Sequence, residues 1–163
     1  MLVFDENNAR KFAQDVWNRV HQDYLNYQEQ PDELLVNISK DRRRTRHYGG
    51  LELGVDCDAN ITMKPAILIA WTCFDKINHQ DGFRFQEYPT IQDHAAIGSI
   101  QGYERMIKAA ICHEIAHALE EYHTADLLVN SFPTRDHKPF KDHSALWHTI
   151  YHTLRERFVN VCY

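Results

Sequence analysis

The chain lacks the features that mark several classes of protein. Its longest apolar run, Ala66 to Trp71, is far shorter than the roughly 20 residues that a membrane-spanning helix needs. No charged start followed by an apolar stretch is found, so we expect no secretory signal peptide. Excess positive charge is also missing: the formal net charge is −5, which argues against binding nucleic acid through the whole surface.

Paired cysteines are absent as well. The four cysteines lie at scattered positions without metal-binding spacing: Cys57, Cys73, Cys112 and Cys162. Without an export signal, such cysteines indicate reduced thiols, and we expect a cytoplasmic location. We expect Cys112 to be a small packing residue of a helix, because a helical wheel places it away from the neighbouring histidines.

The length of 163 residues fits a single domain, residues 1–163, with a sizeable core. Apolar periodicity predicts helices over 7–27, 103–122 and 142–158, and strand-like content over 33–39, 45–55 and 60–69. Pro65 is predicted to end the third strand and to start a short helix. Residues 72–102 have no clean period and are expected to form a hairpin or long loop. This order of elements predicts an α+β fold.

The most informative motif is His113-Glu114-Ile115-Ala116-His117, an HExxH sequence. Residues four apart on an α-helix differ by only about 40° around the axis, so both imidazoles project from one face. They can share one Zn²⁺, and Glu114 lies close enough to take a proton from a zinc-bound water. The apolar residues of this helix lie on its other side: Ile107, Ile111, Ile115, Ala118, Leu119 and Tyr122.

The motif leaves the third ligand open, and His143 is the preferred candidate. Asp142 is a plausible N-cap, which places His143 in the first turn of a helix, on the buried side of that helix. His148 and His152 point away on the same wheel, and we expect both to be solvated.

Two other histidines remain candidates for the third ligand. His123 follows His117 at the metzincin spacing, but Glu120 stands where that motif needs glycine. We expect Glu120 to lie around the metal site without binding the metal, or to have no role. His137, in a loop flanked by proline, is the weaker of the two.

HEIAH followed by His-x-x-x-Trp resembles the SprT-like (Spartan-type) family of small zinc metallopeptidases, and residues 46–71 resemble the strands that precede its active-site helix. The resemblance implies a zincin-like fold of the minigluzincin type, with His113, His117 and His143 as zinc ligands and Glu114 as general base. Ser144 replaces the family's usual glycine. The zinc ribbon that many members carry has no counterpart in this sequence, so the resemblance is to a minimal form of the domain.

A basic run between the first two predicted strands has two interpretations. Its candidates for contact with DNA or substrate are Arg42, Arg43, Arg44 and Arg46, and SprT-like relatives act on DNA-associated proteins. Alternatively, charge there protects a strand edge or forms a solvated turn. The strand predicted over 45–53 is also a candidate edge for binding a substrate peptide as an added strand.

The sequence therefore predicts zinc-assisted hydrolysis of peptide bonds, with one Zn²⁺ per chain and a protein or peptide as substrate. The candidate donors to the oxyanion are Tyr122, His123, Tyr151 and His137. Two other classes stay open: a zinc hydrolase acting on a non-peptide amide, and a non-enzymatic binding or inhibitory protein with structural zinc. The intact Glu114 argues against the second, because a structural site needs no base beside its ligands.

Overall fold

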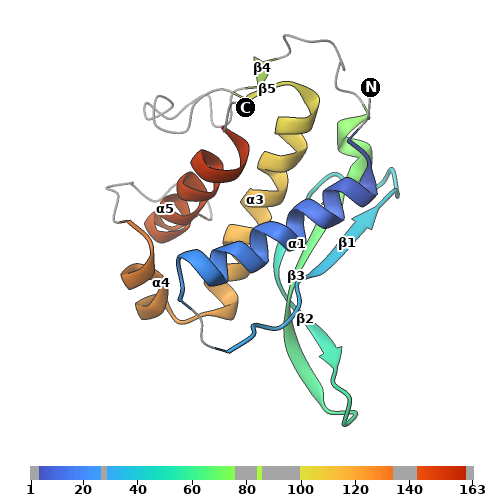
Figure 1. Ribbon diagram of the computed structural model, residues 1–163. Helices are drawn as coiled ribbons and strands as arrows, with labels where there is room; N and C mark the ends of the chain where they lie inside the picture. Colours follow the sequence, from blue (N-terminus) through green and yellow to red (C-terminus); the bar gives the residue numbers. More distant parts are fainter. Residues whose placement is uncertain (1–3, 27–28, 76–83, 86–99, 134–142, 161–163) are drawn as a thin grey trace.

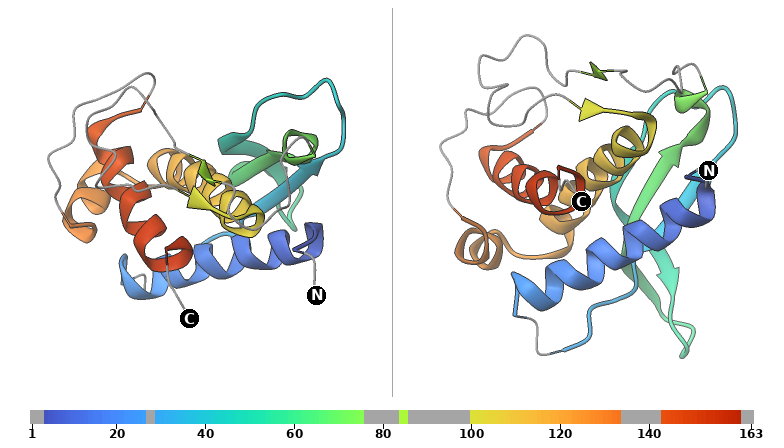
Figure 2. Two further views of the ribbon diagram at one scale, coloured as in Figure 1. Left: turned by 90° about the horizontal axis from the view of Figure 1, so that it is seen from above. Right: turned by 45° about the horizontal axis from the view of Figure 1, so that its top comes forward.

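The computed structural model describes residues 4–26, 29–75, 84–85, 100–133 and 143–160. Over these residues the chain forms an α+β fold in which helices pack on one side of a small mixed sheet (Figures 1 and 2). The predicted fold class is confirmed at this level. No helix within the described ranges is long and apolar enough to cross a membrane.

The elements follow in the predicted order. The helices are α1 (Glu6–Asp23), α3 (Tyr103–Tyr122), α4 (Ala125–Ser131) and α5 (Ala145–Leu154). The strands are β1 (Leu35–Ser39), β2 (Tyr48–Val55), β3 (Ile61–Ala70), β4 (Arg84–Phe85) and β5 (Ile100–Gln101). A 3-10 turn, η1 (Trp71–Phe74), follows β3, and a π-helical turn, η2 (Arg155–Val159), extends α5. Helix α4 was not among the predicted elements.

The main sheet has the order β1-β3-β2, with β1 parallel and β2 antiparallel to the central β3. The prediction that Pro65 ends the third strand is wrong: β3 runs through Pro65 to Ala70, and η1 follows in place of the short helix. The position is tolerable for proline because β1 pairs with β3 only from Ala66 onward, so Pro65 lies at the end of that ladder.

Helix α1 lies across α3 and beside β1 (Figure 1). Asp5 caps it by accepting a hydrogen bond from the amide of Asn8 at 2.9 Å, which satisfies one of the free donors of the first turn. Val16, Trp17 and Val20 of this helix are buried in the core.

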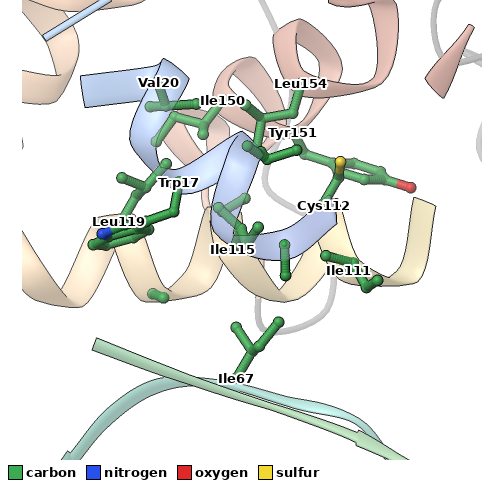
Figure 3. Packing of buried hydrophobic residues seen from close by; sticks show 14 of the residues in the cluster. Trp17, Val20, Ile67, Ile111, Cys112, Ile115, Leu119, Ile150, Tyr151 and Leu154 are labelled. Carbon is green, nitrogen blue, oxygen red and sulfur yellow. The ribbon is translucent and has the colours of Figure 1, made fainter. Parts of the chain in front are cut away.

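Helix α3 lies at the centre of the molecule. Ile111, Ile115 and Leu119 are fully buried in one core cluster with side chains of α1, β3 and α5 (Figure 3). Cys112 is also fully buried in this cluster, as expected of a packing residue. The core thus surrounds the helix on several sides and fixes the direction in which its histidines project.

Helix α5 differs from the prediction in its N-cap residue and in which of its side chains are buried. Asp142 lies outside the described residues, and the N-cap is Ser144, whose Oγ accepts from the Trp147 amide at 2.9 Å. His148 and His152 are 3% and 2% exposed, so the expectation of solvated side chains is wrong. The helix is buried along most of its length, because the body of the protein covers the side that the helical wheel left to solvent.

Candidate metal centre

The HExxH motif lies in the middle of α3, where the helix is regular and packed on its apolar side. The imidazoles of His113 and His117 project together, with ring centroids 5.1 Å apart. Glu114, between them in sequence, is only 7% exposed. The local sequence therefore produces the predicted geometry of this pair.

His143 joins the pair from the segment just before α5. One nitrogen from each of His113, His117 and His143 lies within 4.8 Å of the others, so these three residues could hold a metal ion. Nε2 of His143 is 3.1 Å from Nε2 of His113. Two nitrogens bound to one tetrahedral Zn²⁺ are about 3.3 Å apart, because each Zn–N bond is about 2.05 Å. The donor set and its spacing fit such an ion, although the geometry does not identify the metal.

The rival candidates for the third ligand are not at this cluster. His123 follows the end of α3, where its Nε2 is 2.7 Å from Nε2 of His21 on α1. His21 is buried, and its Nδ1 is 2.7 Å from the carbonyl oxygen of Trp17. The pair therefore joins α1 to the end of α3. His137 lies outside the described residues.

The indole ring of Trp147 packs against all three imidazoles. The indole is fully buried, with centroid distances of 4.5 Å to His113, 5.2 Å to His117 and 4.2 Å to His143. Its Nε1 donates to the carbonyl oxygen of His113 at 3.3 Å. The ring of Tyr151, one turn later on α5, stacks on Trp147 at 4.8 Å. These contacts restrict the rotamers of the imidazoles, which reduces the entropy lost when a metal binds.

A hydrogen bond between side chains ties the third histidine to the helix of the first two. The Ser144 hydroxyl donates to Oε1 of Glu120, one turn after His117 on α3. The same hydroxyl oxygen caps α5, so it fixes the chain directly after His143 to two helices at once. The expectation that Glu120 lies around the site without joining the three histidines agrees with this position.

Burial and mutual repulsion favour the metal-binding state of the histidines. Burial holds the pKa of His113 well below its usual range, and positive charge on His117 or His143 lowers it further. The pKa of His117 falls to about 4, first through burial and then through His143. Neutral imidazole is the form that binds metals. Burial also raises the pKa of Glu114 to about 8, so without a nearby cation its carboxyl group is largely protonated at neutral pH.

Strand β2 lies directly against α3 beside the cluster. A Cβ on Gly49 would lie 2.0 Å from the carbonyl oxygen of Glu114, so only glycine allows the two backbones this close. Strand β2 continues through both Gly49 and Gly50. An isolated Gly-Gly within a strand pattern is a recognisable signal for such a close approach.

The arginines of the basic run are exposed between β1 and β2. Arg42, Arg43, Arg44 and Arg46 all reach solvent, and Arg43 pairs with Asp41 at 3.0 Å. The next residue, His47, is half-buried: its Nδ1 accepts from the Ala70 amide at 2.9 Å and its ring stacks on Phe74. The run thus ends where β2 begins, and the structure does not bring its arginines into the histidine cluster.

Each of the described candidates for oxyanion stabilisation has a hydrogen-bonding partner outside the three histidines. The hydroxyl of Tyr122 donates to Asp32 at 3.1 Å, and that of Tyr151 accepts from Arg155 at 3.4 Å within the core. His123 is paired with His21. The donor for this role is therefore not identified among these residues.

Comparison with known proteins adds no independent assignment: no family model, curated protein or solved structure matches the chain.

Proposed function

We propose that the protein is a zinc-dependent metallopeptidase in which His113, His117 and His143 bind one Zn²⁺ and Glu114 is the general base. The observation that carries the proposal is the convergence of His143, 26 residues beyond the HExxH motif, on the two histidines of that motif. Three neutral imidazoles leave the fourth position of a tetrahedral ion open for water, as in catalytic zinc sites. Structural zinc sites, by contrast, use all four positions for protein ligands.

Zinc held by these three histidines would supply a water of pKa about 7 and would polarise the scissile carbonyl. Glu114 then accepts the proton of the attacking water and passes it to the leaving amine. A cation bound at the adjacent histidines favours the carboxylate form of Glu114 and so opposes the effect of burial on its pKa. Trp147 and the Ser144–Glu120 hydrogen bond keep the three imidazoles in place during this exchange of protons.

The sheet edge beside the cluster supports a peptide as substrate. Among the described strands β2 pairs only with β3, which leaves one side of its backbone without a sheet partner. Gly49 brings this edge against Glu114. An extended peptide that pairs with β2 would therefore pass beside the metal centre. This arrangement favours peptide bonds over small non-peptide amides.

Membership of the SprT-like family and a zincin-like fold are part of the same proposal. The α+β order, the helix that carries HExxH and the His-x-x-x-Trp segment before α5 support both. A DNA-associated protein is the candidate substrate class, supported by the exposed Arg42, Arg44 and Arg46. The free thiols of Cys57 and Cys73 support a reducing compartment such as the cytoplasm.

Zinc content by elemental mass spectrometry tests the ligand set. We expect one zinc per chain in the wild type, a sharp loss in His143→Ala, and no loss in His123→Ala, which removes an imidazole outside the cluster. Zinc that survives His143→Ala would contradict the proposed site.

Cleavage tests the chemistry. Glu114→Gln is expected to retain zinc and to lose hydrolysis of labelled casein by at least about 100-fold, since general-base catalysis typically contributes that much. Equal cleavage by this variant and the wild type would remove Glu114 from the mechanism. Full zinc in the wild type without hydrolysis of casein, or of a DNA-bound protein, would favour a binding protein.

A further inference from the structure

Beyond the metal centre, β2 and β3 form a two-stranded ribbon that extends past the helices (Figures 1 and 2). Strand β1 pairs with β3 only over Ala66–Ala70, whereas β2 pairs with β3 from Ile61 onward. The segments 51–55 and 61–65 therefore have no third strand. A two-stranded ribbon is marginally stable by itself in water, so its exposed surface needs an explanation.

One face of this ribbon is apolar and exposed. Leu53 lies opposite Met63 and Val55 lies opposite Ile61, so all four side chains point to the same side. Their exposed fractions are 72% for Leu53, 49% for Met63, 66% for Val55 and 72% for Ile61. Isolated exposed apolar side chains are ordinary, but four in two adjacent cross-strand pairs form a contiguous patch.

The patch continues the core face of the sheet. Residues alternate along a strand, so Leu53 and Val55 share the face of Gly49, which lies against α3. Gly49 in turn pairs with Ile67, a fully buried core residue. Helices cover this face over the body of the sheet and leave it uncovered along the ribbon (Figure 1). An α-helix, such as α3 over the body of the sheet, is therefore the element that would cover this exposed face of the ribbon.

Charge at the end of the ribbon restricts what can cover it. The turn that joins the two strands contains Asp56 and Asp58, and Oδ1 of Asp56 accepts from the amides of Asp58 and Asn60 at 2.9 and 2.8 Å. Lys64, the basic residue of the ribbon, lies on the opposite face, where its side chain crosses Gly54. Acidic groups therefore border the apolar face. They repel anionic lipids, nucleic acid and the acidic turn of a second copy.

The size of the patch also argues against a self-complementary dimer. A stable interface uses about 20–30 residues a side, whereas the patch offers four large side chains. Along the strand, the patch from Leu53 to Val55 spans about 7 Å at about 3.4 Å per residue. That length matches about five residues of α-helix, and the diameter of one helix, about 10 Å, covers two strands.

We propose that the apolar face of the β2–β3 ribbon (Leu53, Val55, Ile61 and Met63) docks one amphipathic helix of a partner protein. This helix carries a stripe of large aliphatic side chains flanked by lysine or arginine. The stripe covers the two cross-strand pairs, and the basic flank lies near Asp56 and Asp58. Docking there extends the helical layer of the fold by one helix and leaves the His113 cluster open. The surface is a place where a partner would recruit the enzyme to its substrates.

Designed 18-residue helical peptides test the proposal on the whole chain. One peptide carries a leucine stripe with lysine flanks, the second has glutamate in place of lysine, and the third has its stripe broken by serine. Fluorescence anisotropy measures affinity, and NMR chemical shifts locate the contact. We expect the lysine peptide alone to bind, with shifts at Leu53 and Met63. The double variant Leu53→Ser/Met63→Ser should weaken this binding by at least about tenfold, and Asp58→Lys should weaken it to a smaller extent.

Val129→Ser is the matched control, because it removes a 54% exposed aliphatic side chain from α4, away from the ribbon. It should leave affinity unchanged. Both sets of variants alter exposed positions, so circular dichroism should show unchanged folding. Equal binding by the double variant, equal binding of the glutamate peptide, or shifts outside the ribbon would overturn the proposal. Self-association of the wild type that disappears in the double variant would assign the face to a second copy and would also overturn it.

Discussion

Replacing Gly49 by alanine should separate β2 from α3. A Cβ there would lie 2.0 Å from the Glu114 carbonyl oxygen and 2.7 Å from its carbonyl carbon, whereas ordinary contacts begin at 3.4 Å. Neither backbone can rotate away as a side chain would, so the strand must move by about 1.4 Å. Overpacking of this kind costs about 1–3 kcal/mol, and a clash between two backbones belongs at the upper end. For a chain of this size, about 3 kcal/mol lowers Tm by about 6–12 °C.

The matched control is Gly54→Ala on the same strand. Its Cβ would meet only the Lys64 side chain, at 2.8 Å from Cδ, and that flexible chain can move aside. We expect its stability to stay within about 1 kcal/mol of the wild type, since alanine also restricts the unfolded chain. Thermal unfolding followed by circular dichroism, in chelator so that metal binding does not contribute, compares the two. If Gly49→Ala has the same Tm as Gly54→Ala and the wild type, β2 does not lie against Glu114.

Two further predictions concern groups around the centre. Ser144→Ala and Glu120→Ala both remove the Ser144–Glu120 hydrogen bond and should weaken zinc affinity by about tenfold. Glu120→Gln, whose amide oxygen still accepts from the hydroxyl, should keep the wild-type zinc affinity. Competition with a zinc indicator measures these affinities. Equal affinities would show that the bond does not position His143. Burial lowers the pKa of His21. The pKa of His123 falls to about 4, mainly because the ring is buried and also because of the charge on His21. The folded state therefore favours the neutral form of both rings. The unfolded chain therefore binds more protons as pH falls from about 6.5 to 4, and stability should decline over that range. Urea unfolding of zinc-free protein at pH 7 and pH 5 should show a smaller decline in His123→Gln than in the wild type, and identical declines would contradict this role of the pair.

Local pattern predicted the elements that matter most for the site. The helix predicted over 103–122 is α3 with the same bounds, because its apolar period is regular and free of proline and glycine. That period also determines which face His113 and His117 share. The three strands of the main sheet begin and end close to their predicted limits, but β3 continues through Pro65, where propensity alone indicated an end.

Packing decided what periodicity could not. A helical wheel shows which residues share a side, but it does not show how many sides other elements cover. His148 and His152 were assigned to solvent by the wheel of α5, and the fold buries both. Similarly, only the position of α3 showed that β2 has room for no side chain at Gly49.

The sequence by itself determined the HExxH helix and the pairing of His113 with His117, because both depend on contacts within one turn of helix. It preferred His143 over His123 and His137 as the third ligand, but it could not place His143 beside the pair. Only the tertiary structure brought His143 to 3.1 Å from His113 and joined His123 to His21. Distances between segments far apart in the chain depend on how the helices pack around a shared core, and this packing is a property of the whole fold.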